Sequence, residues 1–219
     1  MLQNEQIYAM LKLQASMNAK VNPLWLTAGY SFLRAVVVEG AEAMEHHGWK
    51  WWKAQKCDLP QLQMELVDIW HFALSHFVIR ADGDLDNAAG LIMLNSKAQD
   101  VATFDGVSSE FSVMGVIEKL ELMIGLAVAR KFHIQLFASL LSDCQMTWDE
   151  LYRKYVGKNV LNFFRQDNGY KQGTYVKVWD GREDNEHLVE VLSVIDASDV
   201  RFAERIYEAL NQRYALVAA

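Results

Sequence analysis

The sequence contains few residues that break helices. Its 219 residues include only two prolines, Pro23 and Pro60, and each falls where a helix would begin rather than be interrupted. Cysteine is equally scarce, with Cys57 and Cys144 alone. Two distant thiols provide neither a disulfide framework nor the close spacing of zinc ligands, so we expect both to be reduced. The shortage of proline favours an all-α fold.

Long apolar runs are also missing. No uncharged apolar run reaches about 18 residues, the length that a membrane-spanning helix needs. Residues 1–6 lack the charged and then apolar layout of a secretory signal. We therefore expect a cytoplasmic protein with no membrane partner.

Basic residues are outnumbered by acidic ones, 21 to 28, which gives a formal net charge of -7. A general nucleic-acid surface would be basic, so we expect no nucleic-acid partner. A small polyanionic substrate stays open, because bound metal ions reverse the local field. The length and the 52% hydrophobic content predict one globular domain over residues 1–219.

Hydrophobic periodicity predicts helices along most of the chain. Residues 82–110 are the least periodic part and predict a variable connecting segment, with a short helix at 87–96. Residues 180–219 predict one more amphipathic helix and an acidic turn at 183–185, without a recognisable catalytic motif. The other predicted helices span residues 5–19, 30–47, 60–80, 111–131 and 132–154, and the second ends near Gly48.

Two acidic pairs stand at helical spacing in residues 38–72. Glu39 and Glu42 form the first pair, Glu65 and Asp68 form the second, and each pair is three residues apart. Residues at this spacing lie on one face of a helix, and His46 continues the first face. The rest of the second segment is nearly all apolar. Two such helices packed side by side would bring four carboxylates together.

Four clustered carboxylates repel one another unless a cation lies between them. Oxygen ligands suit a hard cation, so the pattern predicts a Mg²⁺ site, with Mn²⁺ as a possible substitute. The ordinary alternative is a solvated acidic helix face, which an isolated Glu-x-x-Glu usually means. The apolar surroundings of the second pair make that alternative costly.

Two further stretches suggest a ligand that carries phosphate. Residues 49–53 alternate tryptophans, including Trp52, with lysines, including Lys53, and so combine a stacking surface with positive charge. Lys158, Asn162 and Arg165 fall at i, i+4 and i+7, so they share one face if a helix continues through them. Arg and Lys meet phosphate oxygens, whereas an Asn offers a donor and an acceptor to a base edge.

Taken in order, these segments resemble the dimeric all-α dUTPase family, in the superfamily that also holds phage dCTPase–dUTPases and MazG-like nucleotide pyrophosphatases. The resemblance rests on residues 14–18, 39–42, 49–53, 65–72 and 158–170. It implies an all-α helical bundle built around two acidic metal-binding helices. It also implies a homodimer that hydrolyses dUTP, and also dUDP, to dUMP with release of pyrophosphate or phosphate, which limits the incorporation of uracil into DNA.

The resemblance implies a role for each matching residue. Mg²⁺ is held by Glu39, Glu42, Glu65 and Asp68, and a metal-bound water attacks the α-phosphorus. Glu42 orients or deprotonates that water. The implied pocket for uracil and deoxyribose comprises Gln14, Asn18, Trp52, His71, Phe72 and Asn162, and the implied phosphate-binding residues are Lys158, Arg165, Tyr170 and Lys177, with Lys53 also assigned to the substrate.

Three alternatives remain at this point. A related pyrophosphatase acting on dCTP or other nucleotides would keep the acids and change the amides that read the base. A di-iron carboxylate bundle would need Glu-x-x-His pairs, to which Asp68 and His71 are the only approximation. A non-catalytic helical interaction protein would leave the acidic faces in solvent.

Overall fold

The computed structural model describes residues 3–196, 199 and 201–215. Helices dominate it, and the only strands among these residues form two small antiparallel hairpins, β1–β2 and β3–β4. The predicted all-α fold is therefore confirmed. The helices are α1 (Asn4–Val21), α2 (Phe32–His47), α3 (Leu59–Arg80), α4 (Leu85–Asn95), α5 (Val116–Val128), α6 (Ile134–Asp143), α7 (Trp148–Asp167), α8 (Asp184–Val194) and α9 (Phe202–Ala215).

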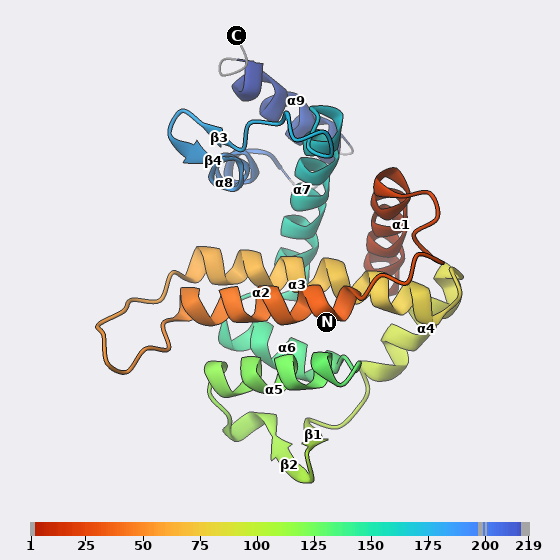
Figure 1. The fold of residues 1–219 in the computed structure, drawn as a ribbon, viewed down its shortest axis with the longest axis vertical. Coiled ribbons are helices and arrows are strands. Elements are labelled where there is room, and N and C mark those ends of the chain that lie inside the picture. The colour runs from red at the N-terminus through yellow and green to blue at the C-terminus, as the bar shows by residue number, and fades with distance from the viewer. Residues whose placement is uncertain (1–2, 197–198, 200, 216–219) are drawn as a thin grey trace.

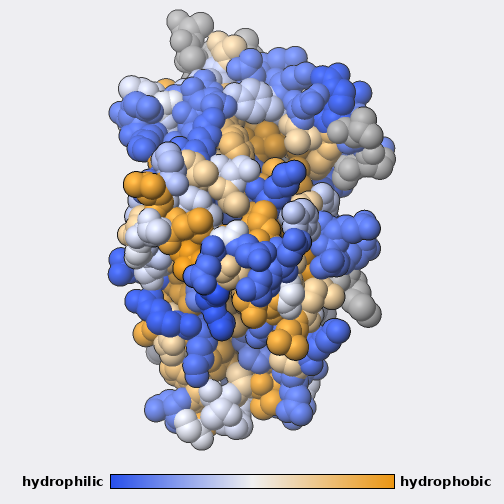
Figure 2. Space-filling view, turned by 90° about the vertical axis from the view of Figure 1, so that its right-hand side faces the viewer, coloured by the Kyte–Doolittle hydropathy of each residue, from blue (hydrophilic) through white to orange (hydrophobic). Residues whose placement is uncertain are grey.

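The helices α2 and α3 run side by side through the middle of the molecule (Figure 1). α5 packs along α2, and α7 leads from α3 and α1 toward the C-terminal helices α8 and α9. On the face shown in Figure 2, polar residues are mixed with apolar ones. Among the described residues, no helix combines the length and apolar character needed to cross a membrane.

The helix α3 is buried on nearly every side. Asp58 caps it by accepting a hydrogen bond from the Gln61 N–H at 3.3 Å, and Pro60 lies in its first turn, as the sequence predicts. Trp70 is fully buried and stacks on Phe137 with ring centroids 5.2 Å apart. Because α3 has so little exposed surface, its two acidic residues lie within the helix packing rather than on an open face.

A glycine sets the spacing between α2 and α5. A Cβ atom at Gly40 would lie 2.8 Å from Cγ1 of Ile124, so only glycine fits at this contact without movement of the neighbour. Gly40 stands between Glu39 and Glu42, and the close packing on α5 leaves both acids on the other side of α2. Gly48, at φ 87°, follows the end of α2 as predicted.

The predicted connecting segment near 82–110 has more structure than its lack of periodicity suggested. Its short helix is confirmed and begins two residues earlier, at Leu85, where Asp84 caps it. The hairpin of β1 (Val101–Phe104) and β2 (Val107–Glu110) was not predicted. Its turn residues Asp105 and Gly106 both have positive φ, which matches a two-residue hairpin turn.

Two of the predicted long helices were wrong in their extent. Residues 111–131 divide into a short 3-10 helix, Phe111–Val113, and α5, which begins after Gly115. Residues 132–154 divide at Gln145, whose φ is positive, and α7 then begins. Thr147 and Glu150 form a capping box there, and this local signal outweighed the continuous apolar pattern.

The C-terminal part contains two helices where the sequence predicted one. A hairpin of β3 (Val178–Trp179) and β4 (Arg182–Glu183) leads into α8, and α9 packs against α7 and α8. Trp179 is fully buried and lies within 6 Å of Phe164 on α7, with ring centroids 5.8 Å apart. This aromatic contact holds β3 against α7, and the carbonyl oxygen of Trp179 lies 2.8 Å from Nε2 of His187 on α8. The end of the predicted range 180–219, residues 216–219, lies outside the described part of the chain.

Candidate active-site cleft

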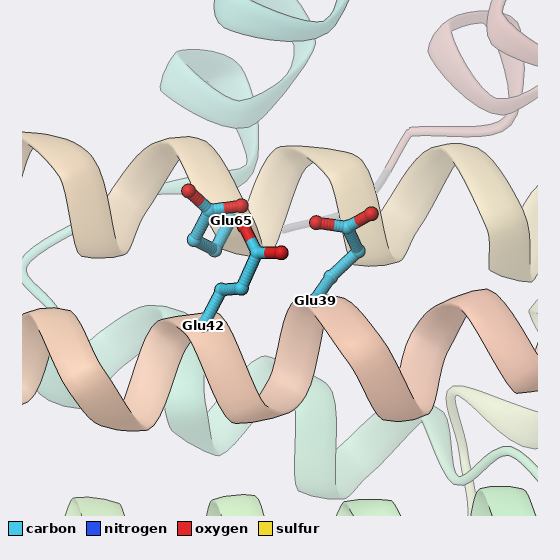
Figure 3. Close-up of side chains that lie close together, drawn as sticks. All are labelled: Glu39, Glu42 and Glu65. Atoms are coloured by element: carbon cyan, nitrogen blue, oxygen red, sulfur yellow. The ribbon is translucent and has the colours of Figure 1, made fainter.

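Three of the four predicted acidic residues meet between α2 and α3. Glu39 and Glu42 extend from α2 toward α3, and Glu65 extends from α3 beside them (Figure 3). Each offers a carboxylate oxygen, and these oxygens all lie within 4.8 Å of one another. Glu65 is buried, Glu39 is half-buried and Glu42 is exposed. The helical spacing and the side-by-side packing of α2 and α3 produce this cluster.

The cluster is electrostatically costly as it stands. Burial, and then the negative charges of Asp68 and Glu42, raise the pKa of Glu39 to about 7. Burial, and then the charge of Asp68, raise the pKa of Glu65 to about 8, although the ammonium of Lys158 acts in the opposite direction. Carboxyl groups with such raised pKa values at close range favour a cation among them.

The fourth acid, Asp68, is bound by a lysine. Its Oδ2 lies 2.8 Å from Nζ of Lys158, which is 3% exposed. Asp68 is therefore adjacent to the three-glutamate cluster and at the same time paired with α7. His46 continues the face of α2, as the spacing predicts, and its Nε2 lies 3.5 Å from Oε1 of Glu65.

The basic residues predicted on α7 share one face, because the helix continues unbroken from 148 to 167. Arg165 donates two hydrogen bonds of 2.8 Å to the carboxylate of Asp184 on α8. Its other contacts are with the Oδ1 atoms of Asn162, at 3.2 Å, and Asn185, at 3.4 Å. The Asn185 Oδ1 also accepts a hydrogen bond of 3.0 Å from Lys158.

The acidic and basic residues face the same cleft, which has a volume of about 490 Å³. One wall comes from α2 and α3, and the other comes from α7 and the first turn of α8. Among the predicted residues, the cleft is lined by Glu39, Glu42, Glu65, Asp68, Lys158, Arg165, Tyr170 and Lys177. The remaining lining residues are His46, Gln61, Glu183, Asn185 and Glu186.

The family model described as dUTPase matches residues 6–170, about three quarters of the sequence. The chain belongs to the dUTPase family. The match includes both acidic pairs and the basic face of α7, so the family assigns dUTP hydrolysis to the chain in general terms. No curated protein matches the sequence.

A second group of predicted residues forms a buried polar network beside the cleft of this dUTPase. Gln14 lies at its centre, with Oε1 at 2.7 Å from Nδ1 of His71 and 2.9 Å from the hydroxyl of Tyr155. The amide of Gln14 donates to Asn18, which donates to Ser75. Burial lowers the pKa of His71 to about 4, and its Nε2 has no hydrogen-bond partner among the described residues.

The other predicted substrate residues are more dispersed. Phe72 stacks on Phe32 with ring centroids 6.5 Å apart, on the side of α3 that faces α2. Trp52 and Lys53 are exposed on the connection between α2 and α3 and do not line the cleft. Tyr170 is half exposed beside the guanidinium of Arg165, and Lys177 forms an exposed ion pair with Glu183.

The structure adds site residues that the sequence did not reveal. Asp184 and Asn185 bind the two predicted cations of α7, although the sequence of the acidic turn at 183–185 shows no catalytic motif. The one local signal was the spacing of Glu183 and Glu186, whose side chain accepts from the Glu183 N–H at 2.9 Å. That signal predicts the start of a helix and says nothing of its partner on α7.

Proposed function

We propose that this dUTPase hydrolyses dUTP to dUMP and pyrophosphate in a Mg²⁺-dependent reaction and that it also accepts dUDP. The supporting observation is the cleft itself. A cluster of carboxylates and a group of cations face each other across it, which suits a polyphosphate bound together with a divalent cation.

The acidic cluster fits such a cation. It consists of glutamate oxygens, which are the ligands that Mg²⁺ and Mn²⁺ prefer. Glu39, Glu42 and Glu65 would hold the ion, with Asp68 next to them. Bound there, it would neutralise the carboxylates, polarise the phosphate oxygens and make water more acidic. The cluster includes no histidine, and His71 instead contacts Gln14, so a di-iron arrangement finds no support among these residues.

The residues of the chain then have separate tasks in the reaction. Glu42, the most exposed member of the cluster, accepts a proton from a water molecule whose oxygen attacks the α-phosphorus. The bond between the α-phosphorus and the bridging oxygen breaks, and the β-phosphate side leaves with the electron pair. Lys158, Arg165 and Lys177 bind the phosphate oxygens of the leaving group. A β-phosphate alone still reaches such cations, which is why we include dUDP.

The buried network of α1, α3 and α7 is our candidate for the base pocket. Gln14 and Asn18 have amides whose orientations are fixed by neighbouring side chains. The free Nε2 of His71 is a buried polar atom that a donor on a base edge would satisfy. Fixed polar groups of this kind reject a ligand that leaves them unpaired, which would favour uracil over cytosine.

The test is a product-release assay with dUTP, dUDP, dCTP, dTTP and UTP, each with Mg²⁺ and with a chelator. We expect pyrophosphate from dUTP, phosphate from dUDP and a loss of both when Mg²⁺ is removed. Equal turnover of dCTP would replace the uracil-specific proposal by a broader pyrophosphatase. Binding of dUDP without hydrolysis would show that the γ-phosphate is required.

We also propose that the active unit is a homodimer. Three exposed valines support it: Val107 on β2, Val113 in the short 3-10 helix and Val128 at the end of α5 are each more than 60% exposed. The mass of the active protein in solution tests this proposal. A fully active monomer would refute it.

A further inference from the structure

Asp184 is a fully buried carboxylate whose described side-chain hydrogen-bond partners are Arg165, which lines the cleft, and Tyr175. Its oxygens accept two hydrogen bonds from Arg165 and a third, of 2.8 Å, from the hydroxyl of Tyr175. Although burial acts in the opposite direction, the hydrogen bonds from Arg165 keep the pKa of Asp184 below its usual value. Asp184 lies on the first turn of α8, outside the part of the chain that matches the dUTPase family.

The contacts of Arg165 show what this carboxylate does. A guanidinium has five N–H donors in a fixed plane. Four described contacts, with Asp184 twice, Asn162 and Asn185, orient that plane, and the ring of Tyr170 lies 5.9 Å from its centre. A long, flexible side chain is thereby held in one position at the cleft.

We propose that Asp184 is a positioning residue for Arg165, so that the segment C-terminal to the family match completes the phosphate-binding wall of the cleft. This inference rests on the proposed function in that it takes the triphosphate of dUTP as the ligand of that wall. Asp184 does not touch the substrate. It acts through Arg165, and Tyr175 supports it by donating to the same carboxylate.

Steady-state kinetics of Asp184→Asn with dUTP test the proposal. An amide in place of the carboxylate turns an NH₂ group toward the guanidinium, which breaks the paired hydrogen bonds. We expect KM to rise about ten-fold, with kcat changed much less, because a charge-assisted pair that orients a binding group is lost. Glu190→Gln is the matched control, because Glu190 also lies on α8 and pairs with two arginines, Arg182 and Arg213, away from the cleft. We expect it to leave KM unchanged.

A double variant separates positioning from a general structural effect. If Asp184 acts through Arg165, Asp184→Asn has no further effect on KM in an Arg165→Ala background. A ten-fold rise in KM in that background as well would overturn the proposal. Should Asp184→Asn fail to fold, Tyr175→Phe removes one hydrogen bond from the same carboxylate, and an unchanged KM for that variant would equally overturn it.

Calorimetric binding of magnesium tripolyphosphate distinguishes this inference from the proposed function. Weaker binding by Asp184→Asn than by the wild type supports the inference, whether or not the wild type hydrolyses dUTP. Failure of the wild type to hydrolyse dUTP would overturn only the proposed function. Equal binding by both proteins overturns the inference, whatever the wild type does with dUTP.

Discussion

The two walls of the cleft carry opposite charges and differ in whether those charges are paired. On α2 and α3, carboxylates lie against one another, and burial raises the pKa values of Glu39 and Glu65. On the opposite wall, each cation already has an anionic partner: Lys158 has Asp68, Arg165 has Asp184 and Lys177 has Glu183. The acidic wall is thus poised to take up a cation, whereas the cations of the basic wall are already paired, Arg165 and Lys177 within that wall and Lys158 with Asp68 across the cleft.

The largest expected effect follows from altering the acidic wall. Glu42→Gln removes a cluster oxygen and the proposed proton acceptor, so we expect kcat for dUTP to fall by about 10²- to 10⁴-fold, with the fold intact. The matched control is Glu45→Gln on the same helix, since Glu45 is exposed and bonded to Trp49 and Lys50. Near-native kcat for Glu42→Gln at saturating Mg²⁺ would exclude Glu42 from the mechanism.

The basic wall offers a comparison between a buried and an exposed lysine. Lys158 is 3% exposed and Lys177 is 48% exposed in its side chain. We expect Lys158→Ala to raise KM for dUTP about ten-fold or more, because a desolvated ammonium interacts strongly with phosphate. Lys177→Ala should raise it only about two- to three-fold, since solvent screens an exposed pair. The reverse order of KM effects would contradict this division of the wall.

The buried network next to the cleft predicts a pH effect on stability. Burial, assisted by the charge of Lys158 and opposed by that of Asp68, lowers the pKa of His71 from 6.5 to about 4. Between these values the unfolded chain binds a proton that the native protein does not, so His71 destabilises the fold as the pH falls from 6.5 to 4 and has no such effect above 6.5. Over this pH range the free energy of unfolding falls by about 3 kcal/mol because of His71.

The variant His71→Asn checks this effect, because asparagine offers a nitrogen to Gln14 without titrating. Denaturant unfolding at pH 7.5, 6 and 4.5 gives the free energy of unfolding of each protein. We expect that of the variant to decline less steeply with acid than that of the wild type. Parallel declines would show that His71 is protonated in the native state.

The smallest expected effect concerns selectivity. Asn162→Ala should lower kcat/KM for dUTP more than for dCTP, by a few-fold, because an amide distinguishes base edges. Arg165→Ala should lower both values in proportion, because a guanidinium meets phosphate in every nucleotide. Asn162 and Arg165 also contact each other at 3.2 Å. Proportional losses for Asn162→Ala would show that it acts through Arg165 rather than on the base.

The sequence predicted well what repeats along a helix. The pairs Glu39–Glu42 and Glu65–Asp68 and the face of Lys158, Asn162 and Arg165 required only helical spacing, and the structure places the acids and both cations around one cleft. It predicted poorly where helices end inside apolar stretches, as at Gln145, since the apolar pattern continues through the break.

The partners of those side chains were not predictable. Asp184 meets Arg165 from 19 residues away because Trp179 packs on Phe164 and holds the hairpin that leads into α8 against α7. Asp68 meets Lys158 because α3 and α7 cross. No local pattern encodes such contacts, since they depend on how separate helices pack.

The close approach of Gly40 to Ile124 has a consequence for how this sequence can change. The face of α2 opposite its acidic pair packs closely on α5 at Gly40. A larger residue at position 40 therefore requires a smaller side chain at position 124. We expect the two positions to covary among homologues. Because the nearest atom is Cγ1 of Ile124, which valine also has, alanine at position 40 should be recovered chiefly with alanine or glycine at position 124 in a library randomised at both.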